Sequence, residues 1–173
     1  MLKYIYMAVL LCAVSVLPSS CSKDEETVVD EVWKAANEKA YNDLTYNSGY
    51  SRLASPSNMG YVFYKVLKKG TSTEPVYFTD TVKVYYTGML ITDSIFDSSE
   101  PPYALPLKSA VSGFCDGFSA AIQYMNIGDR WEIWLPQELG YGVNGTTTSS
   151  GKVVIPPYST LKFEVEIVDV KHF

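Results

Sequence analysis

The stretch Val82–Ser99, VKVYYTGMLITDSIFDSS, decides the fold class of this chain. Its first half alternates, with Val82, Val84 and Tyr86 on one face and their neighbours on the other, and this period of two is typical of a half-buried strand. Gly88 then interrupts the pattern. A glycine in a strand marks a bulge, a bend or a close backbone approach. We therefore predict a strand whose pattern breaks at Gly88.

The end of this stretch, Phe96-Asp97-Ser98-Ser99, places an aromatic ring beside a carboxylate where the chain should reverse. Two interpretations are open. An Asp-Ser-Ser run is usually a turn, because short polar side chains hydrogen-bond to nearby backbone, and a tyrosine on an alternating strand such as Tyr86 usually belongs to the core. Alternatively, Tyr86, Phe96 and Asp97 line a pocket.

Similar alternation predicts the other strands of the domain. We expect strands over 61–67, 130–135 and 161–167, and a short edge strand over 103–107. The stretch 142–152, GVNGTTTSSGK, has no hydrophobic periodicity, and we expect it to be a long surface loop.

One short helix is predicted within this domain. Four apolar residues between Phe118 and Met125 have the i, i+3, i+4, i+7 spacing of a helix face, and Asn126 and Gly128 follow as a stop signal. Strands on both sides of a single helix favour an α+β fold, in which a twisted antiparallel sheet wraps around that helix.

An amphipathic helix is predicted before this domain, over 27–44. Thr27 is the expected N-cap, and the apolar stripe consists of Val29, Trp33, Ala36, Ala40 and Leu44. This stripe can dock on the main domain, or it can pair with a second copy to form a homodimer. The polar stretch 45–59 is predicted to be a linker.

The first residues predict a secretory signal over 1–20. Lys3 precedes an apolar run over 4–17, shorter than the roughly 20 residues that span a membrane. The run Leu17-Pro18-Ser19-Ser20-Cys21 resembles a bacterial lipobox, which implies lipidation of Cys21 and anchoring in a lipid bilayer. The alternative is a cleaved protein without an anchor. The acidic tract 22–26 resembles tags of surface-exposed Gram-negative lipoproteins, or it is a solvated spacer.

These segments divide the chain into three parts: a signal over 1–20, a spacer, helix and linker over 21–59, and the main domain over 60–173. We expect a lipid-anchored protein of the bacterial cell envelope, in the outer membrane and facing the periplasm or the cell surface.

Composition excludes several classes of protein. The 173 residues are 47% hydrophobic with a net charge of −5, which gives no indication of a nucleic-acid partner. Of the three cysteines, Cys12 belongs to the predicted signal and Cys21 is the predicted lipidation site. Only Cys115 is then available, so we expect no intrachain disulfide. The single histidine, His172, argues against a histidine-based triad or metal site. We expect no metal and no cofactor.

Six stretches of the main domain stand out: VYYTGML (84–90), FDSS (96–99), Gly117-Phe118, MNIGDR (125–130), LGYG (139–142) and VIPPYSTLKFEVE (154–166). Together and in this order they resemble the FKBP-type peptidyl-prolyl cis-trans isomerases. The combination with a lipobox and an N-terminal helix resembles the exported members of that family. The resemblance implies isomerisation of X-Pro bonds in exported or envelope proteins, in an aromatic pocket that favours the twisted amide.

The resemblance also implies roles for pocket residues. Phe118 would form the floor, and the Tyr141 hydroxyl and the backbone N–H of Cys115 would bind substrate carbonyls. The implied catalytic residues are Tyr86, Asp97, Tyr141 and Phe163, and the implied substrate-binding residues are Phe96, Tyr103, Phe114, Cys115, Phe118 and Ile155.

Three features depart from the family pattern. The loop after Ser99 lacks the basic residue that relatives often place near the aspartate, so Asp97 is expected to be held less firmly. Phe114 and Cys115 replace branched aliphatic residues and should narrow the pocket. The loop 142–152 is longer than usual and is expected to overhang the mouth. The alternative function is therefore a non-catalytic FKBP-like module that binds peptides or proteins on the envelope.

Overall fold

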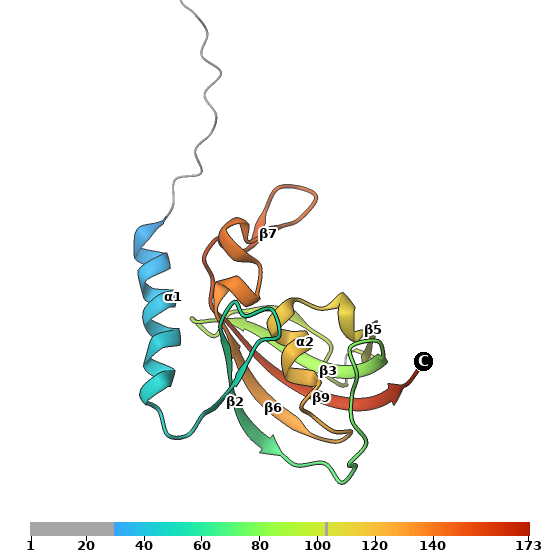
Figure 1. Cartoon of the computed structure of the whole chain (residues 1–173). Coiled ribbons are helices and arrows are strands. Elements are labelled where there is room, and N and C mark those ends of the chain that lie inside the picture. Colours follow the sequence, from blue (N-terminus) through green and yellow to red (C-terminus); the bar gives the residue numbers. More distant parts are fainter. Residues whose placement is uncertain (1–29, 103) are drawn as a thin grey trace, which may run out of the picture.

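The computed structural model describes residues 30–102 and 104–173 (Figure 1). The predicted signal, Cys21, the acidic tract, Thr27 and Tyr103 lie outside the described residues. No helix in the described part of the chain is long and apolar enough to cross a membrane.

An antiparallel sheet forms the frame of the domain. Its strand order is β1-β2-β6-β9-β3-β4, and β5 pairs with β3 beside this path. Central strand β9 buries alternate residues from Leu161 to Ile167, as the period of two predicts. The bounds are β1 Ser51–Ala54, β2 Tyr61–Lys68, β3 Thr81–Leu90, β4 Ile95–Ser98, β5 Leu107–Ala110, β6 Arg130–Leu135 and β9 Leu161–Lys171.

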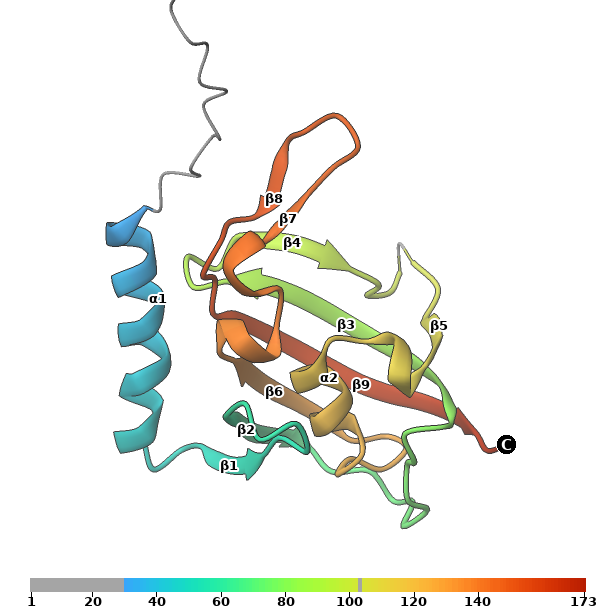
Figure 2. The ribbon, with the colours of Figure 1, turned by 45° about the horizontal axis from the view of Figure 1, so that its top comes forward.

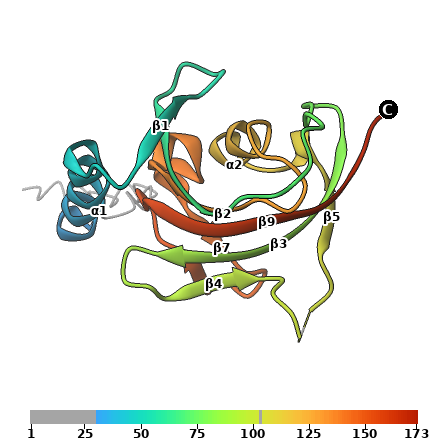
Figure 3. The same cartoon turned by 90° about the horizontal axis from the view of Figure 1, so that it is seen from below.

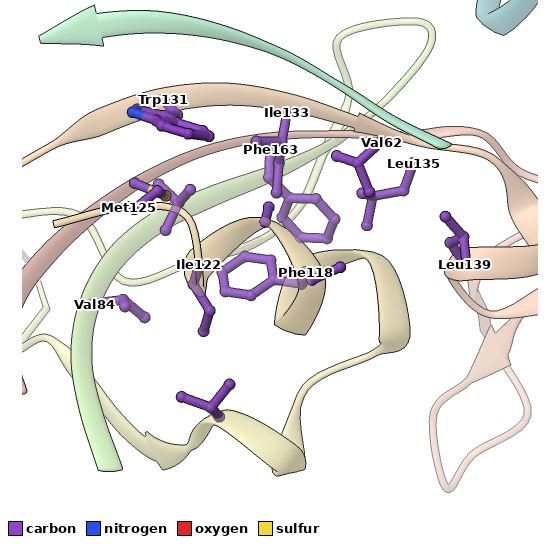
Figure 4. Close-up of a cluster of buried hydrophobic side chains, with 14 of the residues drawn as sticks. Val62, Val84, Phe118, Ile122, Met125, Trp131, Ile133, Leu135, Leu139 and Phe163 are labelled. Carbon is purple, nitrogen blue, oxygen red and sulfur yellow. The ribbon is translucent and has the colours of Figure 1, made fainter. Parts of the chain in front are cut away.

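Helix α2, Asp116–Ile122, lies against the face around which the sheet bends (Figure 3). Its buried side chains pack with apolar side chains of the sheet, including Val62, Ile133 and Phe163 (Figure 4). Burial of this apolar surface drives the packing of helix on sheet. The α+β class, a twisted antiparallel sheet around one short helix, is therefore confirmed.

The end of α2 differs from the prediction. The helix stops at Ile122, because Tyr124 N–H and Met125 N–H bond to carbonyls three residues back, Ala121 O and Ile122 O, a tightening common at helix ends. Met125 is still 1% exposed. The apolar spacing therefore identified the buried residues correctly but overestimated the helix length.

Two details of the strands differ in form from the prediction. The interruption at Gly88 is a register shift against β4 between Gly88 and Met89, and β3 itself continues to Leu90. The edge strand expected over 103–107 is β5, Leu107–Ala110, which pairs with Thr81–Val84 of β3.

The stretch predicted as a loop, 142–152, is partly ordered as a hairpin. After the short helices η3, Gln137–Leu139, and η4, Gly142–Asn144, strands β7, Thr146–Thr147, and β8, Val153–Ile155, pair with each other. The hairpin extends away from the sheet (Figure 2). Because most of its residues are exposed, it buries no continuous face and shows no hydrophobic period.

Helix α1, Glu31–Asp43, docks on the main domain, one of the two roles predicted for it. The Asn37 side chain is 0% exposed, and its Oδ1 accepts a bond from Thr160 N at 2.8 Å. Trp33 Nε1 donates to Ser159 Oγ at 3.3 Å. The N-cap of α1 is Asp30, whose side chain accepts from Trp33 N at 3.0 Å, whereas the expected N-cap, Thr27, lies outside the described residues.

The predicted linker, 45–59, contains more structure than expected. It includes most of the short helix η1, Leu44–Tyr46, and all of β1. Strand β1 pairs with β2 in the register Leu53↔Val62, and Leu53 belongs to the core. The sheet therefore begins at Ser51 rather than near Gly60.

Candidate active site

A cavity of about 340 Å³ opens between β3, β4, the N-terminal half of α2 and the segment that precedes this helix. It is lined by Tyr86, Phe96, Asp97, Leu107, Gly113, Phe114, Cys115, Phe118, Tyr141 and Phe163. Aromatic side chains dominate this lining, so a bound group would exchange water for apolar rings.

The floor of the cavity consists of three interlocking rings. Phe118 from α2 is 3% exposed and meets Phe163 of β9 edge to face, with 5.2 Å between ring centroids and an interplanar angle of 82°. Phe96 of β4 meets Phe163 in the same way at 5.5 Å. Edge-to-face packing is favourable for aromatic rings, so the floor has one well-defined shape.

Gly88 makes room for this packing. A Cβ atom at Gly88 would lie 2.6 Å from Phe96 and 2.8 Å from Phe163, distances that real Cβ contacts do not tolerate. The close approach predicted for this glycine is therefore confirmed, although it involves two rings rather than a second backbone.

The polar side of the cavity is formed by Tyr86 and Asp97. The Tyr86 hydroxyl donates a hydrogen bond to Asp97 Oδ2, and Ser98 N donates to Asp97 Oδ1 at 2.9 Å. Burial, and next the bond to Asp97, raises the pKa of the Tyr86 hydroxyl. Tyr86 therefore stays a proton donor, and it orients the carboxylate without a basic neighbour in the loop.

Tyr141 and Cys115 line the same cavity. Tyr141 is 42% exposed. Its partial burial raises the pKa of its hydroxyl, and the charges of Cys115 and Asp97 raise it further. Among residues 30–102 and 104–173, no hydrogen bond to the Tyr141 hydroxyl is found. Burial also raises the pKa of the Cys115 thiol, so this thiol is not an activated nucleophile.

Comparison with known proteins identifies the family of this domain. The family model described as FKBP-type peptidyl-prolyl cis-trans isomerase matches residues 73–168. The chain belongs to this family. The predicted resemblance is therefore confirmed.

Individual members of the FKBP family extend the match. The FKBP-type 22 kDa peptidyl-prolyl cis-trans isomerase of Escherichia coli K12 is 40% identical over 107 residues, which cover 62% of this chain and 48% of that protein. The outer membrane protein MIP of Legionella longbeachae is 33% identical over 141 residues, covering 80% and 56%. The chain thus spans about half the length of these two relatives.

A solved structure shows the same fold. The crystal structure of a peptidyl-prolyl cis-trans isomerase from Pseudomonas syringae pv. tomato superposes with a TM-score of 0.67 at 24% identity, over 82% of this chain and 96% of that chain.

The FKBP cavity contains most of the residues that the sequence suggested. Ile155 is an exception, because it is 3% exposed within the core and is not part of the lining. The cavity also includes Leu107 and Gly113, which the sequence analysis missed. Gly113 directly precedes the predicted pair Phe114-Cys115, a signal that could have found it, whereas the local pattern around Leu107 indicated only a strand. The predicted residues that line the cavity are Tyr86, Phe96, Asp97, Phe114, Cys115, Phe118, Tyr141 and Phe163.

Metal-ligating side chains do not gather in the part of the chain that the structure describes. No group of three or more His, Cys, Asp or Glu side chains there is placed to hold a metal ion.

Proposed function

We propose that this protein is a peptidyl-prolyl cis-trans isomerase that acts on proline-containing segments of exported or envelope proteins. The observation that carries the proposal is the aromatic floor of Phe96, Phe118 and Phe163 beneath the Tyr86–Asp97 pair. Such a cavity offers an apolar seat for a proline ring and polar groups at its edge for the peptide.

The chemistry needs neither a nucleophile nor a metal. An X-Pro bond rotates over a barrier of about 20 kcal/mol, because rotation removes amide resonance. The twisted amide is less polar than the planar amide. A cavity that replaces water with rings therefore stabilises the twisted form relative to the planar form, which lowers the barrier.

Polar groups hold the peptide while its bond rotates. The Tyr141 hydroxyl at the mouth and the backbone N–H of Cys115 would donate to substrate carbonyls, and Asp97 would face the twisting bond. A stabilisation of about 7 kcal/mol would correspond to roughly a 10⁵-fold acceleration. The proposed catalytic residues remain Tyr86, Asp97, Tyr141 and Phe163, with Phe96, Phe114, Cys115 and Phe118 as contacts of the substrate.

A direct test uses the chain with Cys21→Ser, which prevents lipidation, and a capped X-Pro peptide followed by NMR exchange. We expect Asp97→Ala and Tyr141→Phe to lower kcat/KM, while Tyr124→Phe, which changes a tyrosine 61% exposed and outside the cavity lining, leaves it unchanged. A wild-type rate equal to that of the uncatalysed reaction would contradict the proposal.

A second candidate is a module that binds peptides without turning them over. The stack of Phe114 on Phe118, with 4.6 Å between centroids, supports it, because this stack fills part of the space above the floor. Saturable binding of a proline peptide without faster exchange would favour this candidate over the isomerase.

We also propose that lipidated Cys21 anchors the protein in the outer membrane of a bacterial envelope. The lipobox-like sequence supports this location, and so does the L. longbeachae relative, which is named an outer membrane protein. Cells fed an alkyne-labelled fatty acid should label the wild-type protein but not Cys21→Ser. Equal labelling of both would contradict lipidation at this residue.

For helix α1 we propose docking on its own domain in place of a homodimer. Trp33 and Asn37 of this helix contact the domain, and Val32, on its outer side, is 82% exposed. Light scattering should therefore give a monomer. A dimer that Val32→Glu dissociates would contradict this proposal.

A further inference from the structure

The face of the sheet opposite α2 carries a network of charges centred on Arg130, the first residue of β6. Its Nη2 lies 2.9 Å from Glu164 Oε2, and its Nη1 lies 3.7 Å from Glu166 Oε2. Both glutamates belong to β9, where they alternate with buried residues and so point away from the core. These contacts join two neighbouring strands.

A third carboxylate comes from a different part of the fold. Arg130 Nη2 also lies 2.9 Å from Glu100 Oε1, and Nη1 lies 3.4 Å from Glu100 Oε2. Glu100 belongs to the loop between β4 and β5, whereas β6 is separated from β4 by β9 and β3 in the sheet. The side chains of Arg130 and Glu100 are only 27% and 24% exposed. A bidentate, half-buried pair of this kind is geometrically more specific than an exposed ion pair.

Glu100 directly follows the strand that carries the polar wall of the cavity. Strand β4 is the end of the sheet path and pairs with β3 alone. Just after it, Ser99 is 7% exposed, its N–H donates to Tyr86 O at 2.9 Å, and its hydroxyl accepts from Tyr86 N at 3.2 Å. Ser99 thus fixes the chain on the inner side of the sheet, and Glu100 fixes it on the outer side.

We propose that the Arg130–Glu100 ion pair positions the β4 wall of the cavity. Arg130 and Glu100 are positioning residues, since neither lines the cavity. Together with Ser99, the pair holds the end of β4 in register, and thereby places Phe96 on Phe163 and Asp97 at the Tyr86 hydroxyl. It takes over the role of the basic residue that is absent from the loop itself. This inference rests on the proposed isomerase function.

The test compares two substitutions on the same guanidinium. Glu100→Gln removes the loop carboxylate, and Glu164→Gln removes a carboxylate of β9 while the loop contact stays. With an uncharged, capped Leu-Pro peptide, we expect Glu100→Gln to lower kcat/KM about three- to tenfold, because small displacements of a pocket wall are costly. Glu164→Gln should stay within about twofold of wild type.

The dependence of kcat/KM on salt distinguishes an ion pair from a contact that acts by packing alone. Raising the ionic strength from about 0.05 to 1 M shortens the Debye length to about 3 Å. The wild-type kcat/KM should therefore fall part of the way toward the Glu100→Gln value, because a half-buried pair is screened less than an exposed one, while the variant itself changes little. A wild-type rate that does not respond to salt would overturn the proposal, even where Glu100→Gln fails to fold.

Hydrogen exchange separates this proposal from the isomerase proposal. The backbone amides of Asp97, Ser99 and Glu100 should exchange faster in Glu100→Gln than in Glu164→Gln. Equal exchange in the two variants, or equal losses of activity, would overturn the positioning role. An inactive wild-type protein would contradict the isomerase function instead, and the exchange measurement would still decide the role of the ion pair.

Discussion

The two walls of the cavity are built in different ways. The β3–β4 wall carries Tyr86, Phe96 and Asp97 on strands whose ladder continues into β9, with Tyr86 paired to Val165 and Gly88 to both Asp97 and Phe163. The opposite wall carries Phe114 and Cys115, which are extended residues between the short helix η2, Val111–Gly113, and α2. Phe114 N donates there to Val111 O at 3.3 Å, and Ser119 Oγ donates to the same carbonyl at 2.6 Å.

This difference suggests a division of roles. In the β3–β4 wall, the hydrogen bonds between strands fix the backbone. A changed side chain there disturbs the packing of the aromatic rings that form the floor of the cavity. In the second wall, the positions of Phe114 and Cys115 depend on a few local bonds and on the stack with Phe118. Changes in the first wall should therefore affect stability and turnover, and changes in the second should mainly affect which peptides are accepted.

The largest effect is expected from Gly88→Val in the β3–β4 wall. The added atoms would collide with Phe96 and Phe163, and overpacking of this kind costs about 1–3 kcal/mol. Urea unfolding should show this loss of stability, and kcat/KM should approach the uncatalysed limit. Thr87→Val, at the neighbouring position, loses only an exposed hydrogen bond of 3.2 Å to the Ser98 hydroxyl, and it should cost no more than about 1 kcal/mol. Equal losses of stability in Gly88→Val and Thr87→Val would mean that β3 is sensitive to any substitution and not specifically to a collision with the two rings.

The next largest effect is expected from Tyr86→Phe, which removes the hydroxyl that donates to Asp97. Loss of one hydrogen bond costs about 1 kcal/mol, or about fivefold in kcat/KM. The adjacent Tyr85→Phe is the matched control, because Tyr85 points to the other face of the strand. Unchanged activity in Tyr86→Phe would show that Asp97 needs no orientation by this wall.

The sequence was informative where a structure depends on a local period. Alternation located β2, β6 and β9, and the stretch Val82–Ser99 contained the three residues of the β3–β4 wall. These residues lie within one strand–turn–strand unit, so their proximity follows from neighbouring positions in the chain. Family motifs then supplied Phe114, Cys115, Phe118, Tyr141 and Phe163, which periodicity alone did not bring together.

Features that depend on pairing between distant segments could not be read from the sequence. Leu107 reaches the cavity because β5 pairs with Val84 of β3, a register that no local pattern specifies. Ser51–Ala54 is too short and polar to be recognised as a strand without its partner β2. The contact of Arg130 with Glu100, in the loop after Asp97, was missed for the same reason, because it joins segments on opposite sides of β9 and β3 in the sheet.

A smaller effect is expected from Phe114→Leu in the second wall. Loss of an aromatic stack costs about 0.5–1.5 kcal/mol, and the backbone here is not part of the sheet ladder. We expect most of this loss to appear as lower stability, and overall kcat/KM to change less than about threefold, or about 0.6 kcal/mol, while the ratio between peptides with Phe-Pro and Ala-Pro shifts. Phe78→Leu, at an aromatic residue 54% exposed and outside the cavity, should leave this ratio unchanged. A uniform change for all peptides would contradict a role in selectivity.

The smallest effect is expected from a change of pH. Such a change tests the Tyr86 hydroxyl of the β3–β4 wall without substituting any side chain. Burial, and then the bond to Asp97, raises the pKa of Tyr86, so its hydroxyl should stay protonated where a free tyrosine, with a pKa of about 10, begins to ionise. Turnover measured by NMR exchange should therefore be flat from about pH 7 to pH 9.5. The stability that Tyr86 contributes is fully present below about pH 10, and it is lost as the pH rises through the higher pKa of the folded state.

Burial also raises the pKa values of two other tyrosines, Tyr41 and Tyr50, each to about 12. Because these groups change the stability of every variant at high pH, the effect of Tyr86 is isolated by comparing wild type with Tyr86→Phe. Urea unfolding at about pH 9 and pH 11 should show a larger loss of stability in the wild type, because only the wild type has the Tyr86 proton to lose. Equal losses would mean that the Tyr86 hydroxyl ionises as freely in the folded wall as in the unfolded chain. The hydrogen bond from Tyr86 to Asp97 would then contribute nothing to the stability of the β3–β4 wall.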